Sequence, residues 1–183
     1  MNITLDGYLS GSQCELDWHF KYWNEAMAIS LKEQLEEADT IIMGRVTFNA
    51  MAAYWKNRIQ DVCVPREDLA IADMLNSHTK IVFSKTLVHA DEWNNSIIIK
   101  DNLRTSITCL KKQPGKKLIV YGSHTIVTEL VRLNLVDEFR LWVHPVVIGK
   151  GKALFKNINE TIYLQLYKSK VFSTGVVLLF YSR

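Results

Sequence analysis

The sequence has few of the residues that build cysteine-rich or metal-bound proteins. Its 183 residues contain only three cysteines, and these lie far apart, at Cys14, Cys63 and Cys109. This number and spacing favour neither a disulfide framework nor a zinc site, and they suit a reducing compartment. The five histidines also lack a metal-binding spacing such as H-E-x-x-H. We therefore expect no metal site.

A large excess of charge of one sign and a long apolar run are also missing. The formal net charge is only +3, and no stripe of lysine and arginine accompanies it, which disfavours nucleic-acid binding. The longest apolar stretch, Gly175 to Tyr181, is far shorter than the roughly 20 residues of a membrane-spanning helix. The first residues lack the basic start and apolar core of a signal peptide. We expect a soluble cytoplasmic protein without a nucleic-acid or membrane partner.

The composition is otherwise that of an ordinary globular domain, with 48% hydrophobic and 22% charged residues. No repeat or linker divides the chain, so residues 1–183 are expected to form a single domain. Hydrophobic periodicity predicts helices over residues 24–38, 47–56, 68–76, 103–112 and about 125–133. Apolar runs predict strands over residues 40–43, 80–83, 96–99, 118–121, 138–147, 162–169 and 171–181.

Short strands that are apolar on both faces and alternate with helices are typical of a mainly parallel sheet covered by helices. The last two long strands, which we expect to be joined near Ser169 and Lys170, predict an antiparallel edge. The sequence therefore predicts the α/β class.

Three strand ends carry residues suited to a ligand, because ligands of open α/β sheets bind beyond the carboxyl ends of the strands. At the first, Gly44 allows a sharp turn, Thr47 can cap the next helix, and Arg45 offers a charged fork for phosphate. A routine strand-to-helix turn with a surface arginine explains this segment equally well.

The second strand end carries Ser84 and Lys85, which can reach an adenosine phosphate but also form a commonplace polar loop. At the third, Gly122 permits close backbone approach, and Ser123 or Thr125 can donate to a pyrophosphate at a helix N-terminus. Neither G-x-G-x-x-G nor G-x-S-x-G is present, so this is neither a Rossmann fingerprint nor a nucleophile elbow.

Six segments occur in a characteristic order over nearly the whole chain. They are Leu5-Asp6-Gly7-Tyr8, Leu16-Asp17-Trp18, Gly44-Arg45-Val46-Thr47-Phe48, Phe83-Ser84-Lys85-Thr86-Leu87, Val120-Tyr121-Gly122-Ser123 and His144-Pro145-Val146-Val147-Ile148-Gly149. In this order they resemble the dihydrofolate-reductase-like family, and within it the reductase domain of the bifunctional riboflavin-biosynthesis deaminase–reductase. The resemblance implies a three-layer α/β fold with a mixed, mostly parallel central sheet, helices on both faces and antiparallel C-terminal strands.

The resemblance also implies an NADPH-dependent oxidoreductase that transfers a hydride to a small, heterocyclic substrate. The nearest precedent is the reduction of 5-amino-6-(5-phosphoribosylamino)uracil in the riboflavin pathway. Arg45 would lie on the 2′-phosphate side of the cofactor. The residues that the resemblance places on the cofactor are Gly44, Arg45, Thr47, Ser84, Lys85, Gly122, Ser123, Thr125 and Ile126. Those that it places beside the nicotinamide and substrate are Leu5, Asp6, Gly7, Asp17 and Trp18.

The catalytic acid is left open by the sequence. Dihydrofolate reductases carry one carboxylate on the first helix, and Glu25 and Asp17 are the candidates for it here. Glu25 is also explained as a solvated acid that favours the helix dipole. His144, just before Pro145, is interpreted as structural. An alternative function is therefore a non-catalytic nucleotide-binding module that keeps the fold without turnover.

Two further expectations concern the ends of the chain. The first strand is expected to be short, because Met1 lies almost on the first family segment. Relatives commonly form homodimers, and the apolar segments Leu141 to Val147 and Val176 to Phe180 are the surfaces we expect to supply the contact.

Overall fold

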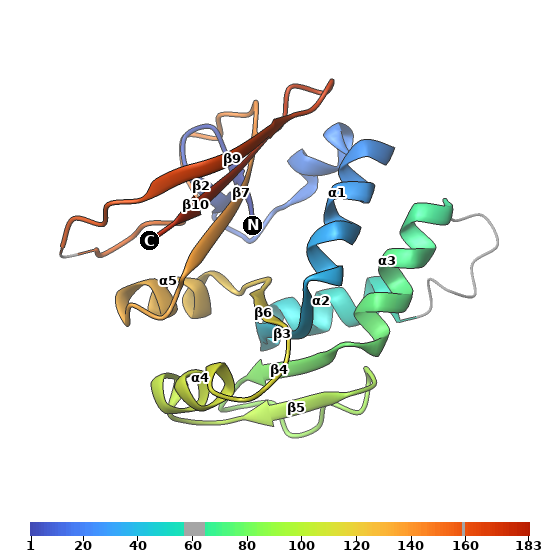
Figure 1. The fold of residues 1–183 in the computed structure, drawn as a ribbon, viewed down its shortest axis with the longest axis vertical. Helices are drawn as coiled ribbons and strands as arrows, with labels where there is room; N and C mark the ends of the chain where they lie inside the picture. The colour runs from blue at the N-terminus through green and yellow to red at the C-terminus, as the bar shows by residue number, and fades with distance from the viewer. Residues whose placement is uncertain (57–64, 159) are drawn as a thin grey trace. The chain divides into compact units, whose positions relative to one another are not determined.

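The computed structural model describes residues 1–56, 65–158 and 160–183, and its ribbon is drawn in Figure 1. Backbone contacts divide the chain into two compact units. Unit 1 comprises Met1–Asn24 and Val127–Arg183, and unit 2 comprises Glu25–Ile126. Cys63 lies outside the described residues, whereas Cys14 and Cys109 are exposed free thiols.

Unit 2 contains a parallel four-stranded sheet. Its strands follow the order β5-β4-β3-β6, and every neighbouring pair is parallel, as can be followed in Figure 1. The bounds are β3 (Ala38–Gly44), β4 (Thr79–Phe83), β5 (Ser96–Ile99) and β6 (Lys117–Val120). Ile41, Ile42 and Met43 on the central strand β3 are all buried, because a parallel sheet covered by helices hides both faces of its inner strands.

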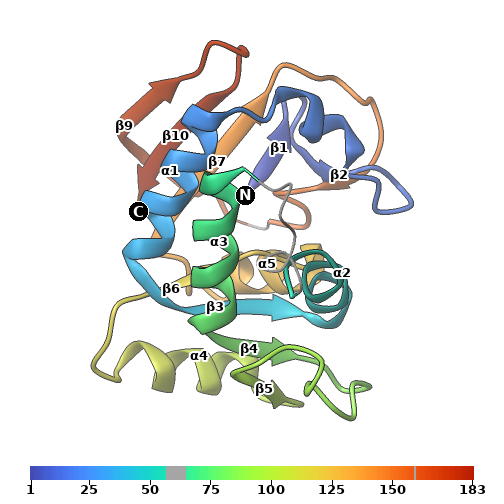
Figure 2. The ribbon, with the colours of Figure 1, turned by 90° about the vertical axis from the view of Figure 1, so that its right-hand side faces the viewer.

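Four helices belong to unit 2. They are α1 (Glu25–Glu36), α2 (Arg45–Trp55), α3 (Arg66–Ser77) and α4 (Leu103–Lys111). Helices α1 and α3 pack side by side, as Figure 2 shows. Helix α2 begins at Arg45 with Gly44 as its N-cap residue, and no side chain caps it. The prediction that Thr47 caps this helix is therefore wrong, because Thr47 is already the third helical residue.

A buried lysine ties strand β4 to the end of helix α3. The Lys80 side chain is fully buried, and its Nζ donates hydrogen bonds to the carbonyl oxygens of Leu75 at 2.9 Å and Asn76 at 2.8 Å. These carbonyls lie in the last turn of α3, where a cation is favourable to the helix dipole. Burial lowers the pKa of Lys80 to about 8.

Unit 1 contains a mixed four-stranded sheet in the order β1-β7-β10-β9. Strand β1 is parallel to β7, while β10 is antiparallel to both β7 and β9. The bounds are β1 (Asn2–Thr4), β7 (Glu138–His144), β9 (Gln165–Val171) and β10 (Val177–Ser182). Together with the all-parallel sheet of unit 2, this sheet confirms the predicted α/β class, its mostly parallel pairing and its antiparallel C-terminal strands. Strand β1 is as short as expected.

Smaller elements complete unit 1. Strand β2 (Tyr8–Ser10) pairs with β8 (Lys152–Ala153), and the 3-10 helix η1 covers Asp17–Tyr22. Helix α5 (His124–Arg132) contributes residues to both units. The sequence did not predict β2, β8 or η1, because each is too short to show a hydrophobic period.

The predicted turn between the last two strands is wrong. Ser169 and Lys170 lie inside β9, and the chain reverses between Phe172 and Val176. There the Phe172 N–H donates to the Val176 carbonyl at 2.9 Å, and Gly175 has a φ of 84°. Strand β7 also ends at His144 rather than at Val147, since Pro145 follows it.

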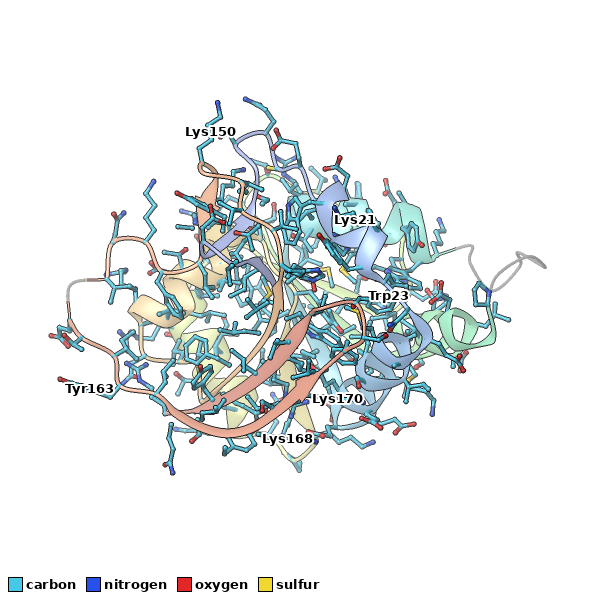
Figure 3. The ribbon with its side chains drawn as sticks, turned by 90° about the horizontal axis from the view of Figure 1, so that it is seen from above. Lys21, Trp23, Lys150, Tyr163, Lys168 and Lys170 are labelled. Atoms are coloured by element: carbon cyan, nitrogen blue, oxygen red, sulfur yellow. The ribbon has the colours of Figure 1, made fainter. Side chains whose placement is uncertain are left out.

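The segments expected to supply a dimer contact are mostly core. Leu141, Trp142, Val176, Leu178 and Phe180 are all buried, so these side chains do not supply a contact surface, whereas Val147, at the end of the first segment, is 67% exposed. The exposed apolar side chains of this sheet lie instead on β9: Leu166, Tyr167 and Val171. Figure 3 shows that the same strand also carries Lys168 and Lys170, and lysines on an edge strand disfavour pairing with other chains.

Candidate functional site

The carboxyl ends of three strands of unit 2 lie at one edge of its sheet. Gly44, the last residue of β3, is in register with Phe83, the last residue of β4. On the other side, the Gly44 N–H donates to the Gly122 carbonyl at 2.9 Å, just beyond the end of β6. The structure therefore brings together the three segments that the sequence singled out.

Two glycines and two hydroxyl side chains form a close cluster at this edge. A Cβ added to Gly44 would lie 2.5 Å from Ser123 Oγ, and a Cβ added to Gly122 would lie 3.0 Å from Thr47 Oγ1. Gly122 has a φ of 123°, and the Gly122–Ser123 peptide bond is cis. We call Gly44, Thr47, Gly122 and Ser123 the glycine–hydroxyl cluster; in this arrangement a Cβ at either glycine would press on a hydroxyl oxygen.

Two helices begin at the glycine–hydroxyl cluster. Helix α2 starts at Arg45 without a side-chain cap, and α5 starts at His124. The first N–H groups of a helix have no partner within the helix and favour an anion. Arg45 and Thr125 are exposed and Ile126 is half-buried, and within the described residues no carboxylate pairs with the Arg45 guanidinium. These features fit the phosphates of a dinucleotide.

The strand end after β4, the second of the three, is shaped by a serine. The Ser84 N–H donates to the Ile99 carbonyl at 3.0 Å, and Ser84 Oγ accepts from the N–H groups of Thr86 at 3.2 Å and Leu87 at 2.9 Å. The hydroxyl thus fixes its own loop and keeps its hydrogen for a further partner. Lys85 Nζ lies 4.0 Å from Asp101 Oδ1, and both side chains are largely exposed, so this ion pair contributes little.

The predicted substrate residues lie in unit 1, and Asp6 holds one part of that unit together. Its carboxylate accepts the Gly149 N–H at 2.8 Å and the Ile148 N–H at 3.2 Å. A hydrogen bond from the Thr4 side chain, and after it the Gly149 N–H, lowers the pKa of Asp6. Asp6 therefore links the turn at residues 5–7 to the loop after β7. Gly7 in this turn has a φ of 84°.

Two side chains beside this turn, Leu5 and Lys150, are exposed. Leu5 is 66% exposed, and Lys150, which follows the fastened loop, extends outward in Figure 3. Gly149 has a φ of 72°, which explains a glycine at this bend.

Helix η1 places Trp18 and Asp17 differently. Asp17 is exposed, whereas Trp18 is half-buried and its ring lies edge-on to that of His144, with centroids 5.2 Å apart. Sequence reasoning interpreted His144 as structural and did not group it with Trp18, although His144 opens the sixth family segment and lies at a strand end.

Neither carboxylate candidate lies in a buried environment. Asp17 is in unit 1 and Glu25 is the first residue of α1 in unit 2, and both are exposed. Among the residues that the structure describes, the buried polar and charged set contains no aspartate or glutamate. A buried carboxylic acid is therefore not available from the described residues as a proton donor.

The part of the chain that the structure describes shows neither a metal-binding cluster nor a membrane-spanning helix. No group of three or more histidine, cysteine, aspartate or glutamate side chains is arranged to hold a metal ion. No helix there is long and apolar enough to cross a membrane.

Comparison with known proteins agrees with the fold and with the family that the segments resemble. The family model of the RibD C-terminal domain matches residues 1–178. The uncharacterized protein YyaP of Bacillus subtilis is 36% identical over 179 residues, which cover 98% of this chain and 90% of YyaP.

Two solved structures show the shared fold. RibD of Acinetobacter baumannii superposes with a TM-score of 0.70 at 14% identity, over 100% of this chain and 56% of that one. Dihydrofolate reductase of Enterococcus faecalis, complexed with NADP(H), superposes with a TM-score of 0.59 at 14% identity, over 100% of this chain and 92% of that one. At such identities these likenesses speak for a dihydrofolate-reductase-like fold alone.

Proposed function

Because the chain belongs to the family of the RibD C-terminal domain, we propose that it is an NADPH-dependent reductase of a small heterocyclic compound. The observation that carries the proposal is the glycine–hydroxyl cluster, where two helix N-termini meet two glycines that leave no room for a Cβ. We also propose that residues 1–183 act together as a single reductase domain.

The cofactor would be held by unit 2. Gly44, Thr47, Gly122 and Ser123 would surround its pyrophosphate, because their N–H and hydroxyl groups are concentrated at one sheet edge. Four further residues of unit 2 would also contact the cofactor: Ser84, Lys85, Thr125 and Ile126. When bound, NADPH supplies the hydride; the protein supplies position and electrostatics.

Arg45 would set the preference between NADPH and NADH. Its guanidinium is exposed at the start of α2, and a guanidinium binds phosphate with a planar fork of N–H donors. Only NADPH carries the 2′-phosphate that would meet this fork.

The substrate would be held by unit 1, through Leu5, Gly7, Asp17 and Trp18. In this proposal Asp6 is a positioning residue, because its carboxylate already accepts two backbone N–H groups from the loop after β7. The nearest precedent for the substrate is the ribosylated aminouracil that is reduced in the riboflavin pathway.

A fluorescence titration with NADPH and NADH tests the cofactor site. The five tryptophans report binding through quenching. Arg45→Ala should weaken NADPH by at least about tenfold, because a charge-assisted hydrogen bond is lost, and leave NADH nearly unchanged. The matched control is Arg104→Ala, which removes an exposed arginine from α4 in the same unit. Equal weakening of both cofactors by Arg45→Ala would refute the role of Arg45.

A second candidate function is a nucleotide-binding module without turnover. It is favoured by the exposure of both Asp17 and Glu25. NADPH binding without oxidation in the presence of carbonyl, pterin and pyrimidine compounds would select it over the reductase.

We also propose that the protein forms a homodimer, as its relatives commonly do. Light scattering decides this, since one chain has a mass of 21.1 kDa and a mass near that value would rule the dimer out.

A further inference from the structure

Two nitrogen atoms of unit 1 are buried without a partner among the described residues. They are Trp18 Nε1 and His144 Nδ1. The two rings are neighbours, with centroids 5.2 Å apart and planes at 78°. Buried polar atoms nearly always have a hydrogen-bond partner, and each exception needs an explanation. The two exceptions lie on neighbouring rings, so a single ligand group that reaches both nitrogens would satisfy them together.

The hydrogen bond on the other side of the His144 ring fixes its tautomer. His144 Nε2 lies 3.1 Å from Asn2 Oδ1; with the Asn2 amide assigned in this orientation, its oxygen accepts and Nε2 carries the hydrogen. His144 Nδ1 therefore presents a lone pair. Burial, with the nearby His19 ring, lowers the pKa of His144 to about 4, so the ring stays neutral at pH 7. Trp18 Nε1–H is a donor only.

This donor and this acceptor select among ligand groups. The group must present an oxygen lone pair to Trp18 and an N–H or O–H to His144. A cyclic amide edge, O=C–N–H, has both on adjacent ring atoms. A carboxylate or phosphate offers only acceptors, so it would leave the His144 lone pair unsatisfied and facing negative charge.

We propose that Trp18 and His144 bind the cyclic amide edge of a heterocyclic substrate, the indole N–H donating to the ring carbonyl and His144 Nδ1 accepting the ring N–H. The inference rests on the proposed function for the identity of this ligand as the substrate of the reductase. His144 is then a specificity-determining residue, rather than the structural one expected from the sequence.

Helix η1 is the element through which such a ligand reaches His144. Its residues Trp18, His19 and Tyr22 surround the His144 ring, with centroid distances of 5.2, 6.1 and 5.8 Å. None of the residues of η1 is buried, and Phe20 is 58% exposed. A short 3-10 segment has weaker hydrogen-bond geometry than an α-helix, so η1 is the element that we expect to move when a ligand reaches His144.

Uracil and 1,3-dimethyluracil are the matched probes for this site, because they share both carbonyls and differ in the ring N–H groups. Binding is followed by NMR on protein labelled with ¹⁵N-tryptophan, in saturating NADP⁺, with the Trp18 indole signal assigned from Trp18→Phe. Uracil should shift the Trp18 indole signal, and 1,3-dimethyluracil should bind about tenfold or more weakly, because it leaves the buried acceptor unpaired.

Three variants separate hydrogen bonding from steric exclusion of the methyl groups. His144→Phe should reduce the preference for uracil to less than about twofold, whereas a steric preference would persist. Trp18→Phe should weaken both probes. Tyr22→Phe, which keeps its ring beside His144, is the control and should keep the wild-type preference.

Equal affinity of the wild-type protein for the two probes, an unshifted Trp18 indole signal, or a preference that survives in a folded His144→Phe variant would each overturn the inference. If His144→Phe does not fold, the wild-type probe pair and Trp18→Phe still decide it. If the protein binds NADPH but not uracil, only this inference is refuted. If the folded protein does not bind NADPH, the proposed function is refuted.

Discussion

Replacing Gly44 by alanine tests whether the glycine–hydroxyl cluster is as tightly packed as the structure indicates. Gly44 has φ −91° and ψ 166°, which alanine adopts freely, so the substitution introduces no backbone strain. Its Cβ would lie 2.5 Å from Ser123 Oγ and 3.3 Å from both Ser123 Cβ and Ile126 Cγ1. The Ser123 hydroxyl must therefore leave its present position.

The size of the effect follows from what can move. Overpacking a tight site costs about 1–3 kcal/mol, and a serine hydroxyl can rotate, which puts this case at the lower end. Alanine also restricts the unfolded chain, which offsets about 0.4–1 kcal/mol. We expect a net loss of about 1 kcal/mol in the free energy of unfolding. NADPH binding should weaken by about tenfold, because the displaced hydroxyl no longer faces the cluster.

The assay is a double-mutant cycle with Ser123→Ala, measured by urea unfolding and by NADPH titration. Removing the hydroxyl leaves only the two contacts at 3.3 Å, so Ser123→Ala should recover part of the unfolding free energy in the Gly44→Ala background. The coupling energy should be about 0.5–1 kcal/mol. Strictly additive effects of the two substitutions would refute the contact between Gly44 and Ser123.

Two further predictions concern stability. Gly151→Ala should lower the free energy of unfolding by about 3 kcal/mol in urea, because its Cβ would lie 2.2 Å from the Ser10 carbonyl oxygen on strand β2 and a backbone atom cannot rotate away. Gly149→Ala, where nothing lies within 4 Å and only the φ of 72° is unfavourable, should cost about 1 kcal/mol; equal losses would contradict the clash. For Lys80, whose folded-state pKa is lowered from 10.5 to about 8, stability should rise with pH between these values, because there the unfolded chain still binds a proton that the folded chain has released. The gain, about 3 kcal/mol at most, should be absent from Lys80→Met in urea unfolding at pH 7.5 to 10.5, and equal slopes for the two proteins would refute the assignment.

Most helices and strands of unit 2 could be predicted because their hydrophobic signals are local. Strand β5 covers Ser96–Ile99 as predicted, and α1 and α4 differ from prediction by one or two residues at their ends. Strand β9 was harder, because an exposed edge strand carries polar residues such as Ser169 and Lys170, which also suit a turn. Pairings such as Ser10 with Lys152 leave no local signal, since the partners are far apart in sequence.

The cofactor side of the candidate site was also easier to predict than the substrate side. Parallel strands with matched ends bring their carboxyl-terminal loops to one edge, so Gly44, Ser84 and Gly122 could be grouped from the strand pattern. The close approach of Thr47 to Gly122 could not be predicted, because it depends on the start of α2 at Arg45. The lone pair of His144 depends on Asn2, 142 residues away.

These differences reflect how each unit would recognise its ligand. The glycine–hydroxyl cluster would use main-chain N–H groups and the space left by two missing Cβ atoms, so it favours glycine at two fixed positions, each next to a turn that the sequence shows locally. The proposed Trp18 and His144 pair would use two side-chain nitrogens, of which the indole N–H always donates while the acceptor role of His144 is set by a third residue, Asn2. Changing any of the three alters which ring edge is accepted without touching unit 2. Relatives with the same cofactor segments can therefore accept different substrates, and their specificity should be sought at the equivalents of these three residues.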